Sequence, residues 1–261
     1  MGTAPRVLLA VVFVVAAWWG ATGLILHLVR RPRSTHRSTL GIATLAVVPA
    51  LMLMRASSAQ TTLAGAELAF ASTLVLWGWL EISFLVGAVV GPRRIACPSG
   101  CRGVRHFGHA VGAILYHELA ILAGAALVAL LCAGQPNRIA LWTFLLLWGM
   151  RISAKLNLFF GVPNTAVELL PPHLRYLGSY FRRRSLQPLL ALSILMAASV
   201  SLRLVSAAAS APLGSFASFE LTLLTTLAML ALIEHCMLAL PLPADAPWRL
   251  LRTRPSTRGC G

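Results

Sequence analysis

Seven apolar runs divide this sequence, and each is long enough, or nearly so, to cross a lipid bilayer as a helix. A transmembrane helix needs about 20 consecutive apolar residues, and lipid offers no partner for unpaired backbone polar groups, so such runs predict helices. The runs are residues 7–28, 40–54, 63–90, 107–132, 139–160, 189–205 and 216–240. We therefore expect an all-α fold, a polytopic membrane bundle of about seven transmembrane helices that forms a single domain over residues 1–261.

The composition excludes an ordinary soluble domain. Hydrophobic residues make up 58% of the 261-residue chain and charged residues 11%, whereas a soluble domain carries about 25% charged residues. The net charge of +15 could indicate a nucleic-acid partner. The basic residues are confined to short segments between the apolar runs, however, as they are in membrane proteins. We therefore expect no nucleic-acid partner.

The basic residues also predict an orientation. Sixteen of them follow the first, third, fifth and seventh runs, and four lie on or near the opposite side. Lys and Arg accumulate in cytoplasmic loops, so this bias places the N-terminus outside and the C-terminal tail, 241–261, in the cytoplasm. Only Arg6 precedes the long first run, so we expect a retained span and not a cleaved signal peptide.

Seven ionisable side chains interrupt the apolar runs at membrane depth. Counting ~1.5 Å per residue from the expected cytoplasmic ends places them ~8–15 Å inside the helices. Four spans of alternating direction would thus put their ionisable groups into one slab, in the cytoplasmic half of the bilayer. The residues of this buried polar network are Glu81, His117, Glu118, Arg151, Lys155, Glu234 and His235.

The first interpretation of the buried polar network is a clamp between helices, because charges at membrane depth are costly unless they pair. Arg151 and Lys155 are four residues apart and share a helix face, so both can face carboxylates.

The second interpretation of the buried polar network is a site for iron, manganese or zinc, which Glu and His suit. Adjacent residues diverge by about 100° on a helix, and the Glu-x-x-His spacing of di-metal bundles is absent. We therefore expect no metal there. The third is pigment contact, with His117 or His235 as the axial ligand of a chlorophyll-type metal.

A long loop, 161–188, joins the fifth and sixth runs and exceeds a typical connection. Its many leucine and aromatic residues argue against disorder. A short amphipathic helix after Pro171-Pro172 would align Leu174, Leu177 and Phe181 on one face. A loop packed on the helix ends is the equal alternative. The residues that we expect to face a partner are Pro171, Pro172, His173, Arg175, Tyr176, Tyr180 and Arg182.

The five cysteines do not indicate a disulfide framework. Cys97 and Cys101 lie in a loop assigned to the cytoplasm, where disulfides are rare. Together with His106 they resemble metal-ligand spacing. A single pair of cysteines is weak support for a metal, and an ordinary Pro/Gly turn is the expected structure.

Five segments carry a family resemblance: WGWLEISFLVGAVVGPRR, YHELA, LWGMRISAKLNLFFGVPN, ELLPPHLRYLGSYF and IEHCMLALPLP. They closely resemble the photosynthetic complex assembly proteins of the PuhE type, which are multi-pass inner-membrane proteins of anoxygenic phototrophic bacteria. The resemblance extends from Trp18 to Pro243. In an inner membrane, the N-terminus that the basic residues place outside would be periplasmic. The resemblance implies a role in assembling the photosynthetic reaction centre and its core antenna, or in supplying bacteriochlorophyll to them.

The resemblance supplies no catalytic residue, so we expect a protein that is not an enzyme. The partners that it implies are reaction-centre and core-antenna subunits, other photosynthetic assembly factors and membrane lipid. The resemblance establishes no cofactor, and bacteriochlorophyll or its precursor is the candidate that it suggests. The alternative function is a metal-dependent membrane enzyme, or a carrier, that acts on a bacteriochlorophyll precursor.

Overall fold

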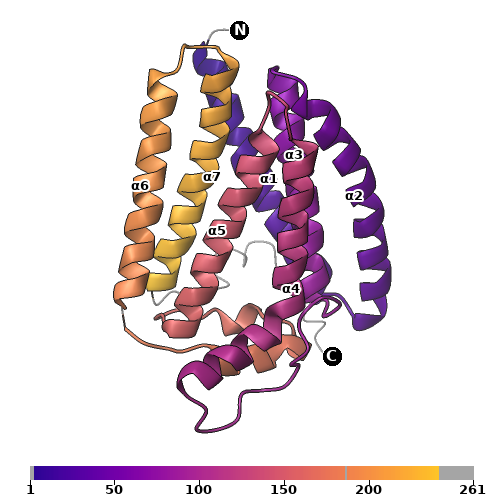
Figure 1. Ribbon diagram of the computed structural model, residues 1–261, viewed down its shortest axis with the longest axis vertical. Coiled ribbons are helices and arrows are strands. Elements are labelled where there is room, and N and C mark those ends of the chain that lie inside the picture. Colours follow the sequence, from indigo (N-terminus) through magenta and orange to yellow (C-terminus); the bar gives the residue numbers. More distant parts are fainter. Residues whose placement is uncertain (1–2, 186, 241–261) are drawn as a thin grey trace, which may run out of the picture.

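The computed structural model describes residues 3–185 and 187–240, and within them the chain is helical (Figure 1). Seven helices are long and apolar enough to span a membrane, which confirms the predicted fold class. The expected tail, 241–261, lies outside the described residues. The seven helices are α1 (Thr3–Arg30), α2 (His36–Ser58), α3 (Leu63–Leu85), α4 (Gly103–Leu131), α5 (Ile139–Phe160), α6 (Pro188–Ser210) and α7 (Phe216–Ala239).

The third helix, α3, forms the centre of the bundle. Its most apolar 18-residue window is 72% buried, far more than that of any other described helix. Trp77 of α3 packs edge-on against Phe144 of α5, with ring centroids 5.4 Å apart. Helices α1, α2, α4, α5 and α7 all pack against α3, and α6 packs against α7 and α5 at the edge of the bundle (Figure 1). Residues 80–84, near the C-terminal end of α3, are accordingly all buried.

Helix α3 ends at Leu85, five residues before the end of the apolar run. Gly87 has φ +85°, a left-handed conformation that favours glycine. Its N–H donates to the Phe84 carbonyl, and the N–H of Ala88 donates to the Ser83 carbonyl, both at 2.9 Å. These two bonds form a Schellman motif, which ends helices at such a glycine. Glu81 consequently lies four residues from the end of α3, and not nine as the length of the apolar run indicates.

The segment after α3 packs directly on the backbone of α4. A Cβ atom on Gly91 would lie 2.3 Å from the Gly112 carbonyl oxygen, so only glycine fits there. The N–H of Arg93 donates to that same carbonyl at 3.2 Å, and the N–H of His117 donates to the Val90 carbonyl at 3.0 Å. This contact holds the middle of α4 beside the end of α3, where the buried polar network lies.

The described residues of the long loop, 161–185 and 187–188, pack under the helix ends. The loop contains two 3₁₀ segments, η2 (Val167–Leu169) and η3 (Pro172–Tyr180). Leu174, Leu177 and Tyr180 are the buried residues of η3. Their spacing of three matches the 3.0 residues per turn of a 3₁₀-helix, so Tyr180 replaces the expected Phe181 on the buried face. These side chains pack against the ends of α3 and α4, as the second alternative for the loop predicts.

Candidate functional site

An ion pair joins α5 to α3 inside the bundle. Arg151 Nη2 donates to Glu81 Oε2 at 2.6 Å, and the side chains are 37% and 9% exposed. Only one oxygen of Glu81 is used, since Glu81 Oε1 and Arg151 Nε are both buried without a hydrogen-bond partner in the described part of the chain. The pair therefore retains unused hydrogen-bonding capacity at the centre of an apolar protein.

A second ion pair joins α5 to α4. Lys155 Nζ donates to Glu118 Oε1, and these side chains are 20% and 26% exposed. Arg151 and Lys155 share one face of α5, but their carboxylates come from two different helices. The two pairs thus fix the position of α5 relative to α3 and α4. Removal of one member of a buried pair leaves an uncompensated charge and typically costs about 3–5 kcal/mol.

His235 belongs to a chain of hydrogen bonds that joins α7, α5 and α6. Its Nδ1 lies 3.1 Å from the Ala231 carbonyl, and its Nε2 lies 2.9 Å from Ser153 Oγ. A carbonyl can only accept, so Nδ1 carries a hydrogen, and in the neutral ring Nε2 accepts from Ser153. Asn157 Nδ2 donates to the Ser153 carbonyl and to Ser193 Oγ, both at 2.9 Å.

The sequence analysis missed Ser153, Asn157 and Ser193. The signal that could have found the first two is their position in the same apolar run as Arg151. Ser153 and Asn157 are four residues apart, so they share a helix face. Uncharged polar residues in a span are less conspicuous than charges, but they have the same need for partners.

His117 and Glu234 stand apart from these contacts. His117 is fully buried, and its ring lies 4.4 Å from the Phe84 ring between centroids. Neither of its ring nitrogens has a hydrogen-bond partner in the described residues. Glu234 is exposed on α7. Within the described residues its charged neighbours are Arg151 and Glu81, and no hydrogen bond or ion pair joins it to either.

The enclosure of both histidines bears on the pigment interpretation. His117 has no exposed surface, and both nitrogens of His235 are already used within the protein. Either ring could become an axial ligand only after its neighbours moved. The clamp interpretation, in contrast, needs no rearrangement of the contacts present.

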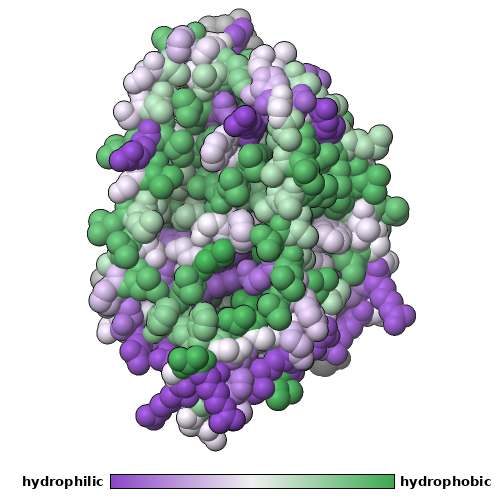
Figure 2. Space-filling view, in the orientation of Figure 1, coloured by the Kyte–Doolittle hydropathy of each residue, from purple (hydrophilic) through white to green (hydrophobic). Residues whose placement is uncertain are grey.

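The buried polar network opens onto the lateral surface of the bundle. Figure 2 shows hydrophilic side chains between α4 and α5, surrounded by a hydrophobic surface at that level. Arg151, Lys155 and Glu118 are each at least one-fifth exposed. Lipid tails cannot bond to these groups, whereas polar side chains of another helix can. Chemically, this surface suits contact with a polar transmembrane segment.

The residues expected to face a partner on the loop divide into two groups. Pro172 and Arg175 are exposed, and Pro171, His173, Tyr176 and Arg182 are half-buried. Tyr180 does not face outward as expected. It is buried because its hydroxyl accepts from Arg93 Nε and donates to the Ile95 carbonyl, both at 2.9 Å. Tyr180 therefore fixes the loop in place. The other six residues of this set remain the ones that we expect to contact a partner.

His173 anchors the loop to the end of α3. Its Nε2–H donates to the Leu85 carbonyl at 2.9 Å, which is one of the carbonyls left unpaired at a helix C-terminus. Burial lowers the pKa of His173 below its ordinary 6.5, and the nearby Arg33 and His36 lower it further against the opposing effect of the Leu85 bond. The ring is thus held in its neutral form beside several cations.

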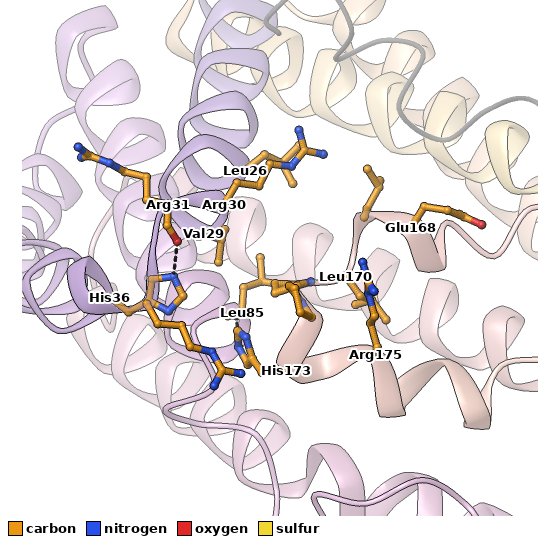
Figure 3. Close-up of a pocket in the computed structure, with 14 residues that line it drawn as sticks. Leu26, Val29, Arg30, Arg31, His36, Leu85, Glu168, Leu170, His173 and Arg175 are labelled. Carbon is orange, nitrogen blue, oxygen red and sulfur yellow. Dashed lines mark hydrogen bonds between the residues drawn. The ribbon is translucent and has the colours of Figure 1, made fainter. Parts of the chain in front are cut away.

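A cavity of about 300 Å³ lies between the loop and the connection from α1 to α2. Figure 3 shows its lining residues, which come from the ends of α1 and α3, from the start of α2 and from the loop. Glu168 is the acidic residue of the lining, and it already pairs with Arg183 at 3.2 Å. The cavity therefore suits an anionic group. Its cationic lining residues are Arg30, Arg31, Arg33 and Arg175, and the imidazole rings of His36 and His173 also line it.

Comparison with known proteins adds a family and a relative. A family model described as "Protein of unknown function (DUF3623)" matches residues 5–258. A protein of Rhodobacter capsulatus, named "Uncharacterized 30.4 kDa protein in puhA 5'region", is 38% identical over 237 residues, which cover 88% of this chain and 85% of that protein. No solved structure matches the chain. Because the family model matches nearly its whole length, this protein belongs to the DUF3623 family.

Proposed function

We propose that this protein is an assembly factor, and not an enzyme, for the photosynthetic reaction centre and its core antenna in the bacterial inner membrane. It holds a client transmembrane subunit during insertion and couples bacteriochlorophyll supply to that step. The resemblance of the sequence to photosynthetic assembly proteins supports this function. The name of the Rhodobacter capsulatus relative, which places it in the puhA 5′ region, supports a link to photosynthesis.

One observation carries the proposal: two ion pairs at membrane depth that are partly open at the lateral surface. A purely structural clamp would be most stable if it were fully enclosed, because an exposed charge faces lipid. Partial exposure leaves polar groups for a client helix to contact as it arrives. Hydrogen bonds between helices in membranes are worth about 0.6–2 kcal/mol each, a strength that allows later release.

The loop offers a second contact for the same client. Its exposed Arg175 and the basic cavity beside it would bind an acidic segment of the client next to the membrane. The arginine bias of the sequence assigns this face to the cytoplasm. A client held at both places would be fixed in depth and in rotation.

The alternative function, a metal-dependent enzyme or carrier for a bacteriochlorophyll precursor, has less support. Glu81 and Glu118 are each engaged by a cation, and His235 is hydrogen-bonded at both nitrogens. In the part of the chain that the structure describes, no three potential metal ligands converge within the buried polar network. No observation favours this alternative over the assembly role, so we do not propose it.

A capture experiment from phototrophic membranes tests the proposal. The tagged full-length protein is purified in mild detergent and examined for bound subunits and for bacteriochlorophyll absorbance. We expect reaction-centre or antenna subunits with the wild type and several-fold less with Arg175→Ala. The matched control is Arg138→Ala, an exposed arginine before α5 at the opposite end of the bundle, which should capture as the wild type does. Equal capture by Arg175→Ala, or no photosynthetic subunit with the wild type, would contradict the proposal.

A further inference from the structure

Four side chains that the proposed function does not use converge where α4 begins. Cys97 Sγ lies 3.1 Å from His106 Nδ1 and 3.9 Å from His109 Nδ1. Cys101 Sγ lies 3.4 Å from His109 Nδ1. The ligand atoms of Cys97, Cys101 and His106 are all within 4.8 Å of one another. His109 Nδ1 approaches the same two sulfur atoms, so both histidines border the cysteine pair.

The local sequence explains this convergence. The N–H of Cys101 donates to the Pro98 carbonyl at 3.3 Å, and Gly100 has φ +78° at the third position of that turn. A type II turn requires such a conformation there, and the turn brings Cys101 back towards Cys97. His106 and His109 are three residues apart in the first turns of α4, so they share a helix face. The turn positions the two cysteine sulfur atoms, and the helix positions the two histidine nitrogen atoms beside them.

The sulfur-to-nitrogen distances are near those of a tetrahedral zinc site. With Zn–S of about 2.3 Å and Zn–N of about 2.0–2.1 Å, a tetrahedron separates sulfur from nitrogen by ~3.6 Å. The three S···N distances of 3.1, 3.4 and 3.9 Å bracket that value. Two thiolates and two neutral imidazoles also balance the charge of Zn²⁺, so the site adds no net charge to a chain that already carries +15.

The surroundings hold the four ligands in place. The N–H of Cys97 donates to Ser179 Oγ in η3 at 2.8 Å. The His106 ring is buried and stacks on Phe159 at the end of α5, with centroids 5.1 Å apart. The cluster therefore lies where the connection from α3 to α4, the loop segment η3 and the end of α5 meet. Figure 1 shows the first turns of α4 passing under α5 at this place.

We propose that Cys97, Cys101, His106 and His109 form a structural zinc site that fastens this end of the bundle. Four protein ligands fill a tetrahedral coordination shell, so the site is closed and holds structure without chemistry of its own. Bound zinc would fix the connection from α3 to α4 and, through Ser179 and Phe159, the loop and α5. The spacing is Cys-x₃-Cys-x₄-His-x₂-His, and the sequence analysis did not include its last member, His109.

Metal analysis of the full-length protein tests this proposal. The protein is purified in mild detergent with a tag free of histidine, loaded with Zn²⁺, dialysed and assayed for zinc per chain. We expect one zinc per wild-type chain and several-fold less zinc in Cys101→Ser and His109→Ala. The matched controls are Cys236→Ser and His27→Ala, which change the same residue types on α7 and α1 and should retain zinc.

Two further measurements keep the test independent of whether the variants fold. Cobalt loaded into the wild type should give thiolate-to-metal charge-transfer absorption, and a chelator should lower its melting temperature in detergent. Folded wild-type protein that retains neither zinc nor cobalt after loading would overturn the proposal. A disulfide between Cys97 and Cys101 in protein purified with its native redox state, or equal zinc in Cys101→Ser and the wild type, would overturn it as well.

Discussion

At the scale of single residues, Arg151 shows how a charge in a transmembrane helix is stabilised. Its guanidinium bonds to Glu81 through a single nitrogen, and its Nε remains buried without a partner in the described residues. The sequence predicted that such a cation needs a carboxylate, because an unpaired charge at that depth is costly. Which carboxylate it meets depends on how α3, α4 and α5 rotate about their axes. That rotation is fixed by packing, so residue types alone could not assign the pairs.

Removal of Arg151 should destabilise the protein more than removal of Arg182. Arg151→Ala leaves Glu81 charged and buried, and we expect a loss of about 3 kcal/mol of unfolding free energy, the lower end for a broken buried pair. Arg182 lies over the Phe159 ring at 5.7 Å, a contact worth about 0.5–1 kcal/mol when exposed. Melting temperatures in one detergent compare the two variants. Equal melting behaviour would mean that Arg151 is not paired in the interior.

His173 gives a prediction for pH, because its folded pKa lies below the ordinary 6.5. As pH falls below 6.5 the unfolded chain binds a proton that the folded chain resists, so stability is lost between 6.5 and the lower folded value. Above 6.5 the contribution to stability is complete. The charged and titratable groups near the ring are Arg33, His36, Arg94 and Tyr176.

His173→Gln tests this titration. A glutamine places an amide N–H near the position of Nε2, so it can still donate to the Leu85 carbonyl, and it does not titrate. We expect the melting temperature of the variant to fall less than that of the wild type as pH is lowered through 6.5. A variant that loses as much stability on acidification as the wild type would assign the pH dependence to other groups.

At the scale of elements, the contact between Gly91 and α4 decides how the end of α3 meets the middle of α4. Gly91→Ala would put a Cβ 2.3 Å from the Gly112 carbonyl oxygen, so one backbone must move. We expect a loss of about 1–3 kcal/mol, as for other overpacked sites. The control is Gly149→Ala in α5, where an added Cβ meets no atom within 4 Å. Thermal unfolding in detergent compares them, and equal stability of the two variants would contradict the close packing.

The elements also show where sequence patterns were sufficient. Hydrophobic run length predicted the seven helices, since a span must satisfy its own backbone in lipid. Run length placed the end of α3 five residues too late, because the residues from Val86 to Val90 are apolar. The helix has already ended there at the left-handed Gly87. The sequence analysis also aligned Leu174 and Leu177 with Phe181, since it assumed a helix of 3.6 residues per turn. A 3₁₀ segment buries Tyr180 instead.

At the scale of the whole molecule, the ion pairs and the metal-ligating side chains lie towards one end of the bundle. The ion pairs, the loop, the basic cavity and the cysteine–histidine cluster all involve the half of the bundle that we expect, from the basic residues, to face the cytoplasm. The sequence predicted this asymmetry from its charges. It could not predict that Cys97 and His109 converge, because that depends on the turn at Gly100 and on the direction of α4.

The central claim, a role in assembling the reaction centre, is tested most directly by deleting the gene in a phototrophic host. Reaction-centre absorbance is measured in membranes of the deletion strain grown under conditions that do not require photosynthesis, and the strain is complemented with the wild-type gene. The account predicts viable cells whose membranes contain much less assembled reaction centre, restored by complementation. Reaction-centre absorbance unchanged from the parent strain would contradict it.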